Sequence, residues 1–223
     1  LYRNETQEEG FINFRYSTYR IGMRGLGNNM TGWGTTWADF DHDTDIDLMT
    51  VNGRVPVTNF ETDPELVRLY GNRLVERERP EYFEWTERVR LDDIGPLLAR
   101  GSAVADYDND GDLDVAINVI GGAAVLLANE AVTGNWLQVE LSRFAPGTII
   151  EVTLPDGRVL VRELHAGSSY LASEDTRFHV GLGHHTQISR LVVSDGKQAL
   201  ATLDDVQANQ LLVIDIGDPA STD

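Results

Sequence analysis

Short apolar runs separated by turn residues set the pattern of the chain. Residues 48–51 and 115–119 are rich in apolar and β-branched side chains, which is typical of buried strands. In the C-terminal third, strand-like runs occupy 136–141 and 149–154, and the turn Pro155-Asp156-Gly157 leads into a further run at 159–164. Two shorter runs follow at 191–193 and 211–214. This pattern predicts an all-β protein whose C-terminal part is a compact sandwich or barrel.

Two aspartate-rich segments lie directly before the buried runs at 48–51 and 115–119. The first loop, residues 39–47, reads DFDHDTDID, and the second loop, residues 106–114, reads DYDNDGDLD. They align without a gap at an offset of 67 residues, from Asp39 to Asp106, and Gly34 matches Gly101 outside them. The motif Leu-Tyr-x-Asn also recurs, at 1–4 and 69–72, with a weaker copy at 127–129. An internal repeat of this length indicates one supersecondary unit used more than once.

A divalent cation explains why carboxylates alternate along both loops, because without a counterion they would repel one another. Calcium takes 6–8 oxygen ligands at roughly 2.3–2.6 Å from carboxylates and backbone carbonyls. In D-x-D-x-D-G-x-x-D, positions 1, 3, 5 and 9 supply side chains and position 7 supplies its carbonyl. The predicted metal residues are therefore Asp39, Asp41, Asp43, Asp45 and Asp47 in the first loop, and Asp106, Asp108, Asp110, Asp112 and Asp114 in the second.

The two loops differ at position 6. Gly111 permits a sharp turn in the second loop, whereas Thr44 stands there in the first, so we expect the first loop to bind more weakly or to bend differently. An EF-hand is excluded, because position 12 holds Thr50 or Ile117 instead of a bidentate glutamate and the flanks resemble strands. Magnesium is disfavoured because it rarely uses an all-protein cage. The sequence predicts about two calcium ions.

Both loops, with the alanine before each, resemble the FG-GAP or VCBS-type repeat, whose units form blades of calcium-binding β-propellers. The last third resembles the ASPIC/UnbV domain in three segments, at 134–139, 167–173 and 179–183, and in the turn at 195–197. These resemblances imply a partial propeller of about two blades followed by a small β domain. They divide the chain into blades at 1–132, an ASPIC/UnbV-like domain at 133–217 and a tail at 218–223.

Two repeats are too few to close a propeller, which typically has four to eight blades. An open fragment exposes strand edges that soluble proteins normally cover. We therefore expect the chain to be part of a longer protein, or a subunit whose missing blades or partner come from another chain. The irregular stretch at 74–90 is either a solvated face or a docking surface offering Tyr82, Phe83 and Trp85.

Composition narrows the classes of function. The formal net charge of −18 opposes binding to nucleic acid, which needs clustered Lys and Arg. The absence of cysteine removes disulfides, zinc-thiolate sites and cysteine nucleophiles. No apolar run approaches the roughly 18–20 residues of a membrane span. No nucleophile elbow or dinucleotide-binding loop is present, so no catalytic residue is predicted.

The leading hypothesis is a non-enzymatic, calcium-stabilised interaction or scaffold module outside the cytoplasm, whether secreted, periplasmic or at the cell surface. Weak extracellular-type calcium sites fill at millimolar calcium and would not be filled in the cytosol. The alternative is a carbohydrate-binding or carbohydrate-processing domain that uses Trp33, Trp37, Trp85 or Trp136 as sugar platforms. A third hypothesis is a hydrolase with catalytic metal loops.

Overall fold

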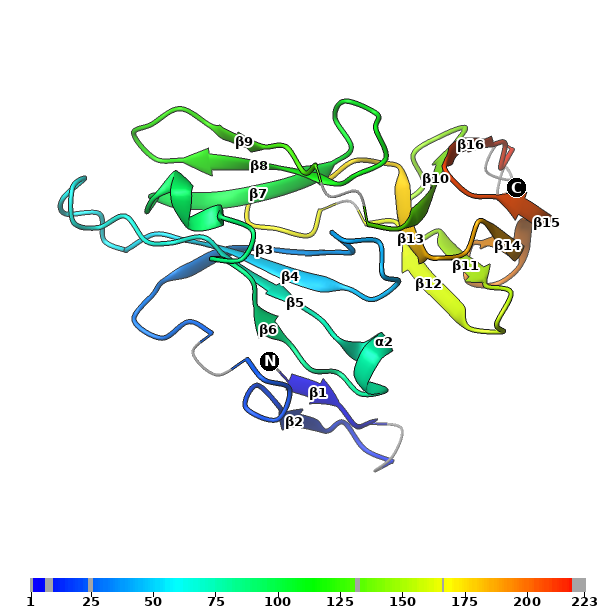
Figure 1. Ribbon diagram of the computed structural model, residues 1–223, viewed down its shortest axis with the longest axis horizontal. Helices are drawn as coiled ribbons and strands as arrows, with labels where there is room; N and C mark the ends of the chain where they lie inside the picture. Colours follow the sequence, from blue (N-terminus) through cyan, green and yellow to red (C-terminus); the bar gives the residue numbers. More distant parts are fainter. Residues whose placement is uncertain (1, 7–9, 24–25, 131–132, 166, 218–223) are drawn as a thin grey trace, which may run out of the picture.

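The computed structural model describes residues 2–6, 10–23, 26–130, 133–165 and 167–217 (Figure 1). It is all-β, with 44% of the residues in strands and 4% in helices, which confirms the all-β part of the predicted fold class. Two sheets built from the repeats lie side by side, and two further sheets built from the C-terminal third pack against one end of them (Figure 1). The predicted tail at 218–223 and residues 131–132, next to the predicted domain boundary, lie outside the described residues.

The repeats form two antiparallel sheets with the strands in sequence order. The first repeat sheet has the order β3-β4-β5-β6 and the second has the order β7-β8-β9. Their strands are β3 (Gly32–Ala38), β4 (Asp47–Asn52), β5 (Arg68–Gly71), β6 (Phe83–Glu84), β7 (Ala99–Ala105), β8 (Asp114–Val119) and β9 (Val125–Leu127). The buried runs predicted at 48–51 and 115–119 are thus β4 and β8. Each aspartate loop connects the first strand of its sheet to the second.

The two repeat sheets share one hydrophobic core. Met49 and Val51 from β4 pack with Val115 and Ile117 from β8, and all four side chains are buried. The first strands of the two sheets lie next to each other, where the hydroxyl groups of Thr36 and Ser102 are 2.8 Å apart. The connection between β5 and β6 contains the short helix α2 (Leu74–Arg77), and a 3₁₀ turn, η1 (Leu91–Ile94), follows β6.

The stretch at 74–90 does not offer the three aromatic side chains predicted as one interpretation. Tyr82 is buried with Met23, Leu48 and Tyr70, and Trp85 packs against the shared core of the repeat sheets. Phe83 is the one of the three that is exposed, at 36%. The three rings therefore do not form the exposed docking surface of that interpretation, because Tyr82 and Trp85 pack inside the molecule.

The C-terminal third forms two sheets that enclose a second core. Their orders are β13-β10-β16 and β12-β11-β14-β15, and we call them the C-terminal sheets. The strands are β10 (Asn135–Leu141), β11 (Ile149–Thr153), β12 (Val159–Glu163), β13 (Phe178–Gly183), β14 (Gln187–Ser194), β15 (Ala199–Gln207) and β16 (Gln210–Ile214). All five predicted runs fall on strands, and Gly157, with φ of 87°, makes the predicted turn between β11 and β12.

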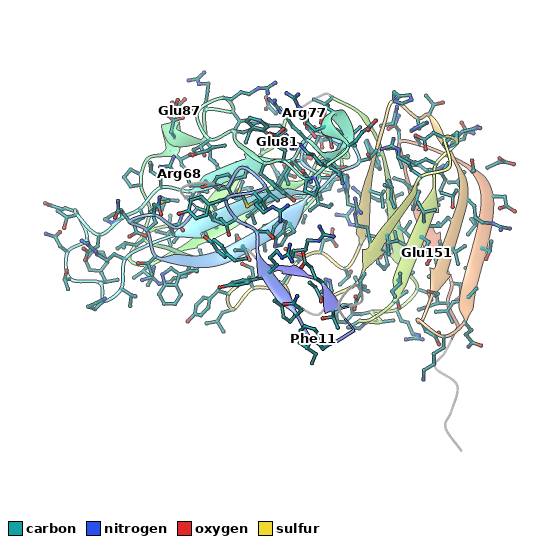
Figure 2. All side chains as sticks on the ribbon, turned by 90° about the horizontal axis from the view of Figure 1, so that it is seen from below. Phe11, Arg68, Arg77, Glu81, Glu87 and Glu151 are labelled. Atoms are coloured by element: carbon teal, nitrogen blue, oxygen red, sulfur yellow. The ribbon has the colours of Figure 1, made fainter. Side chains whose placement is uncertain are left out.

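A small hairpin of β1 (Tyr2–Asn4) and β2 (Phe14–Tyr16) lies beyond the outer edge of the first repeat sheet (Figure 1). Every residue of both strands is exposed, and the rings of Tyr2 and Tyr16 meet edge to face with centroids 5.5 Å apart. Phe11, between the two strands, points outward, as does Glu151 on β11 (Figure 2). Leu1 of the predicted Leu-Tyr-x-Asn motif lies outside the described residues.

Candidate metal centre

The two aspartate loops have the same backbone conformation. Positions 4 and 6 have positive φ in both: 58° at His42 and 89° at Thr44 in the first loop, and 61° at Asn109 and 102° at Gly111 in the second. Thr44 therefore adopts a conformation that favours glycine, instead of bending its loop differently. Both loops run between strands, as predicted, and not between helices.

Four hydrogen bonds from backbone N–H groups to carboxylates recur in both loops. In the first loop, Asp43 and Thr44 donate to the two oxygens of Asp39, at 3.1 and 3.0 Å. Asp45 donates to Asp43 at 2.9 Å, and Phe40 donates to Asp47 at 3.1 Å. In the second loop the equivalent bonds are Asp110 and Gly111 to Asp106, Asp112 to Asp110, and Tyr107 to Asp114. The carboxylates at positions 1, 5 and 9 of each loop are thus fixed in direction by the loop backbone.

A fifth bond ties each loop to the chain just after the third strand of its sheet. The backbone N–H of Asn72 donates to Asp47 at 2.8 Å, and that of Asn129 donates to Asp114 at 2.8 Å. The Asn72 side chain also donates to the carbonyl of Ile46 at 3.2 Å. Both asparagines belong to the recurring Leu-Tyr-x-Asn motif or its weaker copy, but the motif alone does not predict that they bond to the loops.

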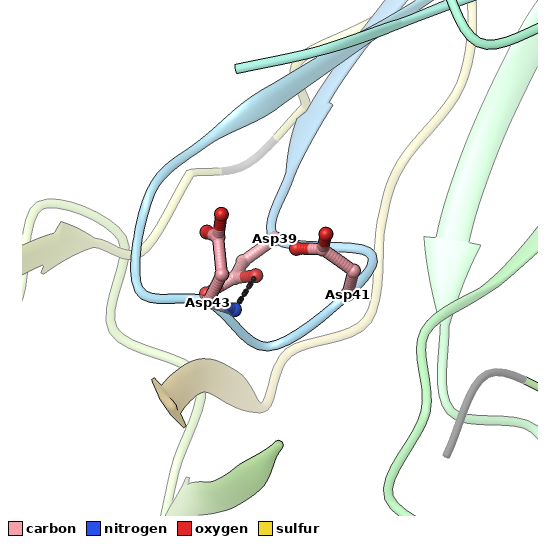
Figure 3. Close-up of side chains that lie close together, drawn as sticks. All are labelled: Asp39, Asp41 and Asp43. Atoms are coloured by element: carbon pink, nitrogen blue, oxygen red, sulfur yellow. Dashed lines mark hydrogen bonds between the residues drawn. The ribbon is translucent and has the colours of Figure 1, made fainter. Parts of the chain in front are cut away.

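The loops bring carboxylates together in three groups. Asp39, Asp41 and Asp43 each offer an oxygen within 4.8 Å of the others (Figure 3). The second loop gathers Asp106, Asp108 and Asp114 in the same way. The third group joins Asp43 and Asp45 to Glu76 of α2. Glu76 was not predicted, since it lies on a connection that the second repeat sheet lacks.

The remaining predicted residues lie in the loops but outside these three groups. Both oxygens of Asp47 accept backbone N–H groups, and an oxygen of Asp110 accepts the N–H of Asp112. Asp112 directs an oxygen toward Nε2 of His42, 3.6 Å away. All ten predicted aspartates therefore belong to the two loops, and seven of them, together with Glu76, make up the three gathered groups.

Burial and mutual repulsion raise the pKa of the carboxyl groups in the first loop. Burial, followed by the charge of Asp43, raises the pKa of Asp41 to about 6 and that of Asp45 to about 7. Burial raises the pKa of Asp47 to about 9 although two backbone N–H groups oppose the shift. In the second loop, burial and the charge of Asp110 raise the pKa of Asp112 to about 6. A cation would lower all of these values, because it stabilises the ionised form.

The residues fit a hard divalent cation. Oδ1 of Asp41 and Oδ1 of Asp45 are buried and have no hydrogen-bond partner among the described residues. A buried carboxylate oxygen without a partner is costly, and a cation would satisfy it. All of the gathered donors are oxygens, which suits Ca²⁺ or Mg²⁺ better than a metal that prefers nitrogen or sulfur.

A cavity of about 130 Å³ lies where the two loops meet the C-terminal sheets. It is lined by the first aspartate of each loop, Asp39 and Asp106, and by Gln138, Arg162 and Arg177. Sequence reasoning missed these C-terminal side chains as neighbours of the loops. No local pattern marks them, because they lie far along the chain from the loops that they contact.

The tryptophans predicted as sugar platforms are mostly packed. Trp33 lies edge to face against Tyr170 and under the guanidinium of Arg100, 4.2 Å from the ring centroid. Trp85 and Trp136 lie against Gly71 and Gly111, so closely that a Cβ on either glycine would be 2.0 Å from the ring. Trp37 is exposed, at 43%. A single exposed ring gives the carbohydrate alternative little support.

Comparison with known proteins identifies the C-terminal part. No curated protein matches the chain. The described residues contain no helix with the length and apolar character needed to cross a membrane. Residues 138–221 match the family model described as ASPIC and UnbV, in a region that begins after both aspartate loops. This match spans most of the C-terminal sheets and supports the ASPIC/UnbV part of the sequence resemblance.

Proposed function

We propose that the chain is a calcium-stabilised interaction or scaffold module that acts outside the cytoplasm. The observation that carries the proposal is the repeated hydrogen-bond network of the two loops. Five equivalent backbone donors fix carboxylates in each loop, and three carboxylate oxygens remain within 4.8 Å of one another in both. Both loops therefore hold three carboxylate oxygens close enough together to bind one hard cation.

The role of calcium in this proposal is structural. A cation held by the first loop would neutralise Asp39, Asp41 and Asp43, and one in the second loop would do the same for Asp106, Asp108 and Asp114. Each would fix the connection between the first and second strands of its sheet. Cation binding then adds directly to the stability of the folded state.

The sheet order supports two blades of an FG-GAP/VCBS-type propeller. Both repeat sheets are antiparallel with strands in sequence order, and their first strands lie side by side. Propeller blades are arranged in this way around a central axis. In this proposal further blades or a protein partner cover the remaining edges.

Two points support a location outside the cytoplasm in this proposal. The ASPIC and UnbV family consists of small extracellular-type domains. Calcium sites of weak affinity also require the millimolar calcium found outside cells. We propose no catalytic role, because carboxylates that surround a cation leave little room for an activated water.

Calcium titration by isothermal calorimetry tests the proposal. We expect two sites in the full chain, loss of one site in Asp41→Asn and loss of the other in Asp108→Asn. Asp204→Asn is the matched control, because Asp204 is an exposed acid on β15 that pairs with Arg190, away from both loops. Absence of calcium binding, or two sites retained in the double variant, would refute the proposal.

A further inference from the structure

Both aspartate loops face the C-terminal sheets, and three residues there make four contacts with the second loop. The side-chain amide of Gln138 on β10 donates to Oδ2 of Asp106. Arg177, just before β13, donates to the carbonyl of Asp106 at 2.6 Å and to the side chain of Asn109 at 2.8 Å. Nε2 of His179 lies 2.8 Å from the carbonyl of Gly111. These contacts reach positions 1, 4 and 6 of the loop.

The first loop is held in a similar way. The backbone N–H of Gly183 donates to the carbonyl of His42 at 2.7 Å, and Arg158 donates to the hydroxyl of Thr44 at 2.9 Å. Gly181 approaches the loop so closely that a Cβ there would lie 2.1 Å from Oδ2 of Asp39. The C-terminal sheets therefore contact positions 1, 4 and 6 of this loop as well.

The two loops also meet each other at the same junction. His42 of the first loop is 1% exposed, and its ring centroid lies 5.0 Å from that of His179 on β13. Its Nε2 is 3.6 Å from an oxygen of Asp112 in the second loop. Each loop is thus in direct contact with the other loop and with β13.

Three arginines of the C-terminal sheets face these acidic loops. Arg158 and Arg177 bond to loop residues, and Arg162 lines the cavity between Asp39 and Asp106. In a chain of net charge −18, these cations and a bound divalent ion act on the same carboxylates. Both favour the ionised, ordered form of the loops.

We propose that the C-terminal sheets hold both loops in their liganding conformation, so that calcium binding and docking of these sheets form one linked equilibrium. Gln138 and Arg177 are positioning residues for the second loop: they orient the carboxylate and the carbonyl of Asp106 without touching the cation. This inference rests on the proposed function. Linkage is reciprocal, so a contact that strengthens calcium binding is itself strengthened, to the same extent, by calcium.

The test compares Arg177→Ala and Gln138→Leu with the matched control Arg190→Ala. Arg190 lies on the same sheets, but it pairs with exposed Asp204 and contacts neither loop. We expect the calcium dissociation constant of one site to rise 10- to 100-fold in the first two variants, as for other residues that orient metal ligands. The dissociation constant of the other site, and those of both sites in Arg190→Ala, should change less than threefold.

A second measurement separates linkage from simple loss of stability. In the unmutated chain, calcium should slow amide hydrogen exchange in β13, and this protection should shrink in Arg177→Ala. Unchanged calcium affinity in both loop-facing variants, or equal exchange in β13 with and without calcium, would overturn the inference. If Arg177→Ala does not fold, Arg177→Lys keeps the charge but loses the paired hydrogen bonds, and the same change in affinity is expected of it.

The outcomes also separate this inference from the proposed function. If the unmutated chain binds no calcium, both fail. If it binds two ions, and Asp108→Asn removes one while Arg177→Ala and Gln138→Leu bind normally, the calcium role stands and only the linkage fails.

Discussion

Position 6 has a similar backbone conformation in both loops, although the residue there differs. Thr44 and Gly111 both have positive φ, at 89° and 102°, although only glycine adopts that region without strain. The hydroxyl of Thr44 accepts a hydrogen bond from Arg158, which compensates part of the cost. Gly111 also has a steric role, because the ring of Trp136 lies directly over it.

Replacement of Gly111 by alanine separates these two roles. We expect Gly111→Ala to lower the free energy of unfolding by about 3 kcal/mol or more, from backbone strain and the clash with Trp136. Gly147→Ala is the matched control, since Gly147 has φ of 87° with no atom within 4 Å of the added Cβ. It should cost about 1 kcal/mol. An equal decrease in the free energy of unfolding of the two variants, measured by denaturant unfolding, would show that the Trp136 contact is unimportant.

The raised pKa values of the first loop predict pH-dependent calcium binding. The pKa of Asp41 is about 6 and that of Asp45 about 7 in the metal-free protein, so part of the loop is protonated near neutral pH. Calcium requires the ionised form and must release these protons. Apparent affinity should therefore fall as pH decreases from 8 to 6. Calorimetry in two buffers of different ionisation enthalpy measures the released protons. A calcium affinity that stays the same across this pH range would contradict the prediction.

The strands and turns of the C-terminal sheets could be predicted from local pattern, and the exceptions have physical causes. β10, β11 and β12 follow from apolar runs and from the turn at Gly157. β13 and β15 were not predicted as strands; in β15, Asp204 and Asp205 interrupt the apolar positions and Asp205 has φ of 54°. The positions of the loop aspartates were predictable from their spacing. The approach of Gln138 and Arg177 was not, because contacts between distant segments leave no local pattern.

The last aspartate of each loop connects two elements, and its removal should affect more than metal binding. Asp114 accepts N–H groups from Tyr107 in the loop and from Asn129 after β9. Asp114→Ala removes the acceptor of both bonds, and a hydrogen bond to a charged group typically contributes about 1.5–3 kcal/mol.

Asp108→Ala provides the comparison, because Asp108 is exposed and belongs to the same carboxylate group. In EDTA we expect Asp108→Ala to change the free energy of unfolding by less than about 0.5 kcal/mol, and Asp114→Ala to lower it by about 2 kcal/mol or more. Both should abolish calcium binding by the second loop. Similar stability of the two variants in EDTA, measured by urea unfolding, would show that Asp114 does not join the loop to β9.

At the scale of the whole molecule, the acidity of the chain is concentrated where its sheets meet. Both loops lie at the junction between the repeat sheets and the C-terminal sheets, and the cavity there is lined by residues from all of them (Figure 1). Repulsion among these carboxylates therefore acts on the contacts that join the parts of the molecule, and cations would relieve it. For this reason we expect calcium to affect the stability of the entire chain.

Thermal unfolding with and without calcium tests this claim most directly. At a calcium concentration 100-fold above its dissociation constant, each site contributes about 2.7 kcal/mol. Each kcal/mol shifts the melting temperature of a chain of this size by about 2–4 °C, so two sites should raise it by roughly 10–20 °C over the protein in EDTA. Magnesium at the same concentration should raise it less. An equal melting temperature in calcium and in EDTA, with metal removal verified by elemental analysis, would contradict the account.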